Sequence, residues 1–220
     1  METYIKFYAQ VNQNTVIQLQ RQVEQFLLQG MKTLHLLLST PGGSVHDGIS
    51  VYNLLKGLPI EVNTYNFGSV DSIGVVMFCA GSNRYSVPHA RFLLHPVAMQ
   101  IMSPQALDEP SIEEKLKLVK ADQSNIAKVI SCTINKQVEE VQKLIHSRTT
   151  LEPEEAKSKG LVTEIKSSLV PAGVPLISIY DNAVAMQQGI PGIQIPIPLR
   201  GIVQPGPQGV TSITDSFTTI

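Results

Sequence analysis

The sequence lacks the features that mark several large classes of protein. It has two cysteines and no tryptophan in 220 residues, and 17 lysine and arginine residues stand against 18 aspartate and glutamate residues. This balance leaves no broad basic footprint for nucleic acid. The N-terminus has no basic segment followed by an apolar stretch, and no run of about 18 apolar residues offers a membrane span. We therefore expect a cytoplasmic protein without membrane or nucleic-acid partners.

Motifs for phosphate and metal ligands are missing as well. Neither GxGxxG nor GxxxxGK[ST] occurs, and the five histidines show no HExxH spacing. Cys79 and Cys132 have no metal-ligand spacing and lie in apolar surroundings, so we predict two buried free thiols in a reducing compartment. We expect no metal and no cofactor.

What the sequence does contain is an alternation of strand and helix patterns. Apolar residues alternate in some segments as in a strand and recur in others at helical spacing. The predicted strands and helices alternate over residues 4–11, 15–29, 33–40, 45–58, 60–68 and 72–81. Two short strands follow around Pro88. This order predicts an α/β fold of βαβ repeats with a parallel sheet, in which chemistry gathers at the carboxyl ends of the strands.

Two further helices are predicted in the C-terminal half. Residues 111–146 contain no proline and carry Glu-to-Lys pairs at near-helical spacings, which predicts one long helix with a solvated charged face. Residues 151–160 predict a short helix that ends at Gly160 and leads into a strand.

The composition changes at Val170. From there to the end, proline and glycine recur and the charged residues are Asp181, Arg200 and Asp215. Prolines at this density do not fit a helix or an interior strand. We predict an α/β domain over residues 1–169 and an apolar C-terminal extension over residues 170–220, which packs as an arm along its own domain or a neighbour. The alternative is a disordered tail, which the small number of charged residues disfavours.

Two glycine-bearing loops are expected to carry the chemistry. "STPGGS" (39–44) and "GSVDSIG" (68–74) each leave a strand for a helix, and "HP" (95–96) closes a strand. A serine hydroxyl, an imidazole and free backbone N–H groups are the components of acyl transfer. We expect Ser72 to be the nucleophile and His95 the base, with the N–H groups of Gly43 and Ile73 available for an oxyanion.

Each of these residues alone has a plainer interpretation. A double glycine is common in turns, a serine before a helix is commonly a cap, and a histidine on an apolar strand is commonly a hydrogen-bonded core residue. The ordered set on consecutive strand-to-helix junctions favours the catalytic interpretation.

The motifs together resemble those of the proteolytic subunit of the Clp protease, a self-compartmentalising serine peptidase. The resemblance rests on "LLLSTPGGSVHDGISVYNLL", "GSVDSIG", "AGSNRYSVPHARFLLHP" and "LEPEEAKSKGLVTEI", and runs from about Ile5 to Ile165. It implies that Ser72 attacks peptide carbonyls, His95 is the general base, and the Gly43 and Ile73 N–H groups form the oxyanion hole. It also implies that the long helix is the family's handle, through which two stacked homo-oligomeric rings meet, and that the substrate is a peptide or an unfolded protein.

The third catalytic residue departs from the family pattern. The family has an aspartate a few residues before the "EEA" helix, and Arg148 occupies that position here, with Ser147, Thr149 and Thr150 as neighbours. Thr149 is one candidate replacement. Asp71 is another, although a residue adjacent to Ser72 is expected to point its side chain away, and the alternative is a carboxylate that favours the helix dipole. A missing carboxylate predicts slow catalysis, with a loss that reaches about 10⁴-fold in the serine-protease precedent.

A second departure lies at the N-terminus. In the family a gating segment that meets an AAA+ unfoldase precedes the first strand, and this chain begins almost at that strand. An unfoldase partner is therefore allowed by the resemblance but disfavoured by this feature.

Three functions stay open on these observations. The first is a serine endopeptidase, and the second is a catalytically inactive ring or scaffold subunit of the same type. The third is a crotonase-like enzyme that holds a thioester enolate with paired N–H groups. The intact "GSVDSIG" and "HP" motifs speak against the third function, because that class needs no serine nucleophile.

Overall fold

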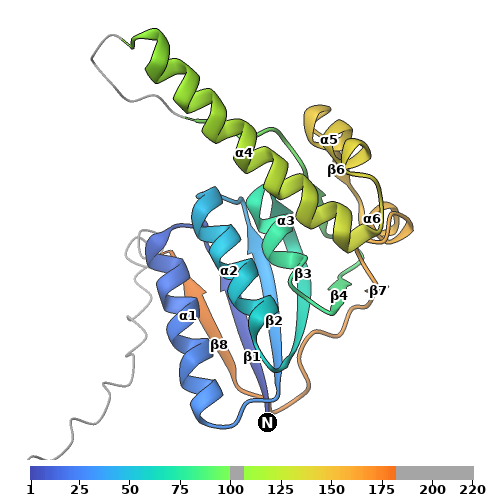
Figure 1. The fold of residues 1–220 in the computed structure, drawn as a ribbon. Helices are drawn as coiled ribbons and strands as arrows, with labels where there is room; N and C mark the ends of the chain where they lie inside the picture. Colours follow the sequence, from blue (N-terminus) through green and yellow to red (C-terminus); the bar gives the residue numbers. More distant parts are fainter. Residues whose placement is uncertain (100–106, 182–220) are drawn as a thin grey trace, which may run out of the picture.

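A sheet of eight strands organises the protein. The computed structural model describes residues 1–99 and 107–181, and within them the main path of the sheet has the order β6-β5-β3-β2-β1-β8, with β4 beside β3 and β7 beside β4 (Figure 1). The strands are β1 (Glu2–Tyr8), β2 (Thr33–Thr40), β3 (Glu61–Asp71), β4 (Asn83–Ser86), β5 (Arg91–Leu93), β6 (Thr150–Leu151), β7 (Glu164–Ile165) and β8 (Leu176–Tyr180). The helices are α1 (Gln13–Leu28), α2 (Val45–Gly57), α3 (Ile73–Phe78), α4 (Glu109–Ile134), α5 (Val138–His146) and α6 (Pro153–Ser158).

The parallel sheet predicted from the sequence is confirmed. Among the described strands, β5 and β6 form the antiparallel pair and the other pairings are parallel. The carboxyl ends of β2, β3 and β5 therefore lie along one edge of the sheet. This edge is where a parallel α/β sheet places its binding crevice.

Helices cover one face of the sheet. In Figure 1, α1, α2 and α3 lie side by side on this face, and aliphatic side chains from β1 and β2 pack beneath them into the main core. Helix α1 begins with a capping box, in which Asn12 accepts from the Thr15 N–H and Thr15 accepts from the Asn12 N–H. Its buried residues recur at helical spacing, as the sequence predicts: Val16, Leu19 and Val23.

The opposite face carries tyrosines. Tyr4 and Tyr65 are buried there with Leu37 in a second, smaller hydrophobic cluster. The chain between β7 and β8 packs against this cluster through Val170 and Val174. The two faces of the sheet are thus covered by different means, one by helices and the other by an extended segment.

The predicted helix over 111–146 is wrong in one respect, because it is two helices. Asn135 ends α4 in the left-handed conformation with φ of 53°, and α5 begins at Val138. Asparagine tolerates this conformation better than most residues, so it terminates a helix without proline. The buried residues of α4 all lie in its C-terminal half, from Ile126 to Ile134, and its N-terminal half projects beyond the sheet in Figure 1.

The prediction of two buried thiols is half wrong. Cys79 is buried at the end of α3, where burial raises the pKa of its thiol to about 11. Cys132 is exposed, because the residues that α4 turns inward at this level are Ile130, Ser131 and Ile134. Both thiols are free.

The sheet extends into the predicted C-terminal extension. Strand β8 pairs in parallel with β1, from Tyr4 with Leu176 to Tyr8 with Tyr180. Residues 182–220, which hold most of the predicted apolar arm, lie outside the described residues, so the boundary at residue 170 and the role of the arm stay predictions. In the described part of the chain, no helix has both the length and the apolar character that a membrane span needs.

Candidate active site

The first strand-to-helix junction consists of Gly42 and Gly43, between β2 and α2. Both have positive φ angles, 88° and 147°. A Cβ on Gly42 would lie 2.7 Å from the Cβ of Ser72, and one on Gly43 would overlap the carbonyl oxygen of Val11. The glycines are therefore required by lack of space as well as by backbone conformation.

The second junction is a single residue, Ser72. The sequence predicts a loop over 68–74, but β3 continues to Asp71 and α3 begins at Ile73. Ser72 makes the turn with φ of 57° and ψ of −126°, and its hydroxyl caps no helix N–H. A non-glycine residue in this region of the backbone map is strained, and such strain clusters at functional sites. The plainer interpretation of Ser72 as a helix cap is not what the structure shows.

Two backbone N–H groups beside Ser72, those of Gly43 and Ile73, have no hydrogen-bond partner among residues 1–99 and 107–181. Val11 donates to the Gly42 carbonyl and accepts from the Ser44 N–H, both at 2.8 Å, so this bridge does not use the N–H of Gly43 between them. Ile73 is the first residue of α3, and the first N–H groups of a helix have no partner within the helix. Both predicted oxyanion donors thus belong to the two junctions that meet at Gly42 and Ser72.

His95 lies just beyond the end of β5. Its Nδ1 is 2.8 Å from the carbonyl oxygen of Pro96. A carbonyl can only accept, so this contact is a hydrogen bond when Nδ1 carries the hydrogen, and in that tautomer Nε2 is the nitrogen that can accept a proton. A general base in a serine hydrolase needs this tautomer.

The segments that carry the two residues are joined by backbone hydrogen bonds. The Ser72 N–H donates to the Leu93 carbonyl at 2.7 Å, and the Leu94 N–H donates to the Thr149 carbonyl at 2.9 Å. Leu94, the residue before His95, is therefore bonded to the residue that precedes β6, while Ser72 is bonded to the last residue of β5.

One cavity of about 90 Å³ brings Ser72, His95 and Gly43 together. Its other lining residues are apolar and come from α2, α4, α5 and the chain around His95: Val45, Leu94, Val97, Ala98, Ile126, Ile130 and Ile145. Among the lining residues that the structure describes, the half-buried serine and histidine are thus the polar side chains and the others are apolar or glycine.

The candidates for the third catalytic residue lie elsewhere. Both carboxylate oxygens of Asp71 accept from the Arg91 guanidinium, at 3.1 and 2.9 Å, and the Ser69 hydroxyl donates to one of them at 2.8 Å. Arg148 is exposed, with φ of 52°. The Thr149 hydroxyl donates to the Leu144 carbonyl at 2.8 Å. Neither these three residues nor Ser147 and Thr150 line the cavity.

Several residues of this region carry no signal in the sequence. The Pro96 carbonyl is a backbone group, and the isoleucines from α4 and α5 are indistinguishable in sequence from other core positions. The "HP" dipeptide was the one available indication of the Pro96 contact. Among the described residues, no cluster of three or more His, Cys, Asp or Glu side chains suits a metal ion.

A serine on a strained turn, an imidazole whose Nδ1 faces a carbonyl and the N–H groups of two strand-to-helix junctions are the components of serine-hydrolase chemistry. The Clp protease family model matches residues 1–168. The chain belongs to the Clp protease family.

Known relatives and structures agree with this assignment. The chain is 28% identical over 139 residues to the ATP-dependent Clp protease proteolytic subunit 1 of Chlamydia felis, and 27% identical over 139 residues to subunit 2 of Chlamydia trachomatis. Each match covers 62% of this chain and 66% of the relative, so it spans slightly less than two thirds of the relative's length. A mutant of ClpP1 from Listeria monocytogenes has the same fold, with a TM-score of 0.68 at 22% identity over 75% of this chain and 91% of that chain.

Proposed function

We propose that this protein is a serine endopeptidase in which Ser72 is the nucleophile and His95 the general base. The observation that carries the proposal is the shared cavity of Ser72, His95 and Gly43, with Ser72 held at a positive φ angle. A strained backbone at a solvent-reachable hydroxyl is explained by a reaction that needs the hydroxyl there.

The proposed reaction gives each of these groups one role. Ser72 Oγ attacks the carbonyl carbon of a peptide bond while its proton passes to His95 Nε2. The Gly43 and Ile73 N–H groups donate to the resulting oxyanion. His95 then gives the proton to the leaving amine, and a water molecule repeats the sequence to release the acyl group from Ser72.

The Pro96 carbonyl supports this reaction in place of the family's aspartate. It fixes the His95 tautomer through the 2.8 Å contact with Nδ1. A neutral carbonyl stabilises the imidazolium less than a carboxylate does, so we expect slow but measurable turnover.

The cavity lining supports an apolar side chain on the substrate. A cavity of about 150 Å³ lined by aliphatic residues accommodates benzene, and this cavity measures about 90 Å³. We expect aliphatic residues such as valine or leucine to be preferred on the acyl side of the cleaved bond. Lysine is disfavoured because an ammonium group would lose its hydration there.

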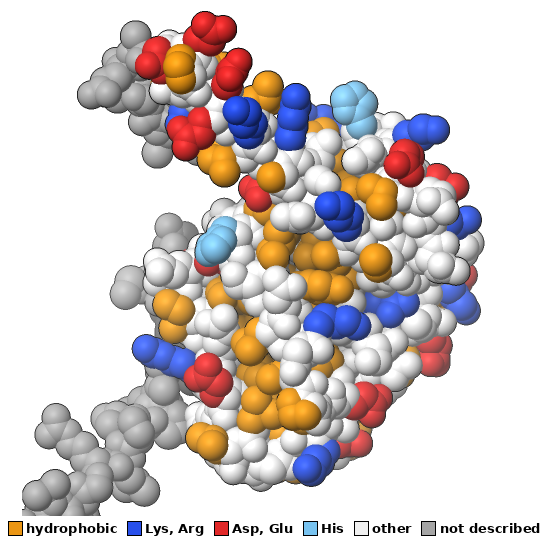
Figure 2. Space-filling view, in the orientation of Figure 1, with side chains coloured by type: hydrophobic (Ala, Val, Ile, Leu, Met, Phe, Trp, Pro, Cys, Tyr) orange, Lys and Arg blue, Asp and Glu red, His pale blue; other side chains and the backbone are white. Residues whose placement is uncertain are grey.

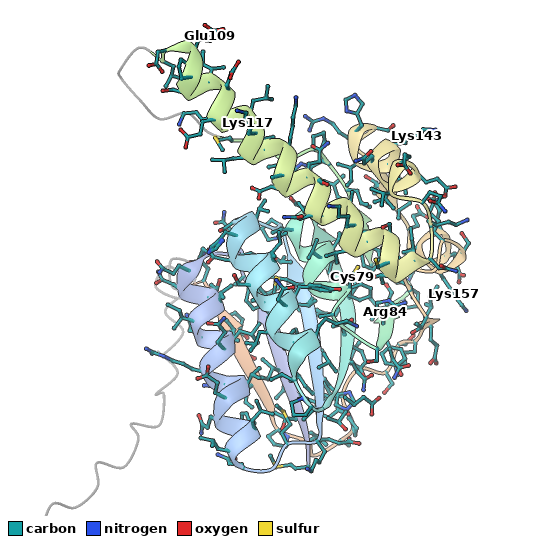
Figure 3. The ribbon with its side chains drawn as sticks, in the orientation of Figure 1. Cys79, Arg84, Glu109, Lys117, Lys143 and Lys157 are labelled. Carbon is teal, nitrogen blue, oxygen red and sulfur yellow. The ribbon has the colours of Figure 1, made fainter. Side chains whose placement is uncertain are left out.

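Assembly into rings of this chain is part of the proposal. The projecting half of α4 exposes Ile112, Leu116 and Leu118, each at about half of its full area. Figure 2 shows hydrophobic side chains interspersed with acidic and basic ones on the projecting helix. The acidic and basic residues labelled there in Figure 3 include Glu109 and Lys117. Apolar side chains on an unsupported helix favour a second copy as the partner.

Peptide hydrolysis tests the proposed reaction. Fluorogenic peptides that differ only in the residue before the cleaved bond would be incubated with wild-type protein, Ser72→Ala and His95→Ala. Wild type is expected to cleave the leucine or valine peptide at least about tenfold faster than the phenylalanine or lysine peptide. Activity that persists in Ser72→Ala would contradict the proposal.

A second candidate function is an inactive scaffold subunit. It is favoured by Arg148, which occupies the position of the family's aspartate with its side chain exposed. Ring formation without hydrolysis of any peptide, and without labelling of Ser72, would support it.

A further inference from the structure

Asp71 and Arg91 form a bidentate ion pair that the proposed reaction does not use. Asp71 ends β3 directly before Ser72, and Arg91 begins β5 four residues before His95. The Asp71 side chain is 10% exposed, and each of its oxygens accepts from Arg91. Bidentate arginine–carboxylate pairs fix geometry as well as charge.

The sheet register explains why these two side chains meet. Ser69 pairs with Arg91 and Asp71 with Leu93 in the parallel ladder of β3 and β5. Ser69, Asp71 and Arg91 therefore project from the same face, and the guanidinium reaches diagonally to the carboxylate. The intervening residues Val70 and Phe92 are fully buried on the other face.

Further contacts hold the same two segments. The Ser69 hydroxyl donates to Asp71, and the Asn66 side chain donates to the Arg91 carbonyl at 2.8 Å. Beyond the ion pair, the ladder ends with the bond from the Ser72 N–H to the Leu93 carbonyl. The pair thus lies at the point where β3 delivers the nucleophile and β5 leads to the base.

We propose that Asp71 and Arg91 are positioning residues that keep Ser72 and His95 at the relative position that the reaction needs. The short β5, with three residues, has few ladder bonds of its own to resist slippage. The Asp71–Arg91 ion pair, called the clamp from here on, joins the ends of β3 and β5 and resists this slippage. The resistance matters because a displacement of a reacting group by about 1 Å can lower the rate about 100-fold. This role rests on the proposed function of Ser72, and it assigns Asp71 a task other than orienting the imidazole.

The rate of Ser72 acylation tests the clamp. Wild type, Asp71→Ala, Arg91→Gln and Arg91→Lys would be treated with a fluorophosphonate over a range of concentrations, which separates the maximal acylation rate from the apparent probe affinity. Asp71→Ala and Arg91→Gln are expected to lower the maximal rate by about 10- to 100-fold and to leave the affinity nearly unchanged. Arg91→Lys keeps the positive charge but lacks the planar guanidinium that donates to both carboxylate oxygens. Its maximal acylation rate should therefore fall between those of wild type and Arg91→Gln.

A matched control is the ion pair of Lys159 and Glu155 on α6, with an N–O distance of 3.7 Å. Glu155→Gln also removes one charge of a pair and is expected to leave the acylation rate unchanged. If Asp71→Ala does not fold, Arg91→Gln decides the question, because the Arg91 side chain is 48% exposed. Wild-type acylation rates in folded Asp71→Ala or Arg91→Gln would overturn the clamp.

Crystal structures separate this proposal from the function itself. If wild-type Ser72 does not react, the proposed function fails, and the clamp is judged by the Ser72 Oγ to His95 Nε2 distance in wild type and Asp71→Asn. A changed distance supports the clamp. An unchanged distance overturns it.

Discussion

The two strand-to-helix junctions of the site solve the same backbone problem with different residues. After β2, the turn is made by Gly42 and Gly43 at φ of 88° and 147°, and after β3 it is made by Ser72 at φ of 57°. The junctions touch, since a Cβ on Gly42 would lie 2.7 Å from that of Ser72. The junction after β2 therefore has glycines at its positive φ angles, whereas the junction after β3 has a serine, for which a positive φ angle is strained.

This difference distinguishes residues that the backbone geometry requires from a residue that the proposed reaction requires. At Gly43 a side chain would overlap the Val11 carbonyl, so glycine is dictated by space. At Ser72 glycine would satisfy the backbone better than serine does. The hydroxyl is therefore the feature that requires an explanation, and nucleophilic attack provides one.

The largest expected effect in this comparison comes from Gly43→Ala. The added methyl group displaces the junction from Val11 and moves the Gly43 N–H, and loss of one oxyanion donor costs about 10²- to 10³-fold in rate. Peptide hydrolysis measures the loss. Gly30→Ala is the control, because Gly30 also has a positive φ angle, 83°, but has open space around it. Equal activity in the two variants would show that the Gly43 junction has no catalytic part.

A smaller effect is expected from Arg148→Asp, which restores the family's residue. Aspartate suits the left-handed backbone at this position, with φ of 52°. If the Pro96 carbonyl fixes the His95 tautomer, as we propose, the rate of Ser72 acylation should rise by less than about tenfold. A rise near the roughly 10⁴-fold scale of a mispaired triad would mean that the tautomer is not fixed in wild type.

The smallest effect concerns stability at the second junction. Ser72→Gly and Ser72→Ala both remove the hydroxyl, but only glycine relieves the positive φ angle. Ser72→Gly should therefore be more stable to unfolding than Ser72→Ala by about 1 kcal/mol. Denaturant titration of both variants measures the difference, and a more stable alanine variant would show that Ser72 is unstrained.

The sequence predicted the parts of this molecule that depend on local pattern. The alternating strands and helices, Gly160 at the end of α6 and the two short strands around Pro88 agree with the structure. The break at Asn135 was missed because a left-handed C-cap needs neither glycine nor proline. The loop predicted over 68–74 was wrong because strand pairing with β5 extends β3 to Asp71.

In the site, too, the sequence predicted the residues that local motifs mark and missed the contacts that depend on strand pairing. Ser72, His95 and Gly43 were chosen from motifs, and the structure places them around one cavity. The partner of Asp71 could not be predicted, because Arg91 is 20 residues away and only the β3–β5 register brings it near. The strand β8 was also missed, since its pairing with β1 joins segments from opposite ends of the chain.

The most direct test of the central claim is intact-mass spectrometry after incubation with a fluorophosphonate probe. We predict a single adduct on the wild-type protein and none on Ser72→Ala. An adduct of equal yield on Ser72→Ala, or no adduct on folded wild type at any probe concentration, would contradict the assignment of Ser72 as an activated nucleophile.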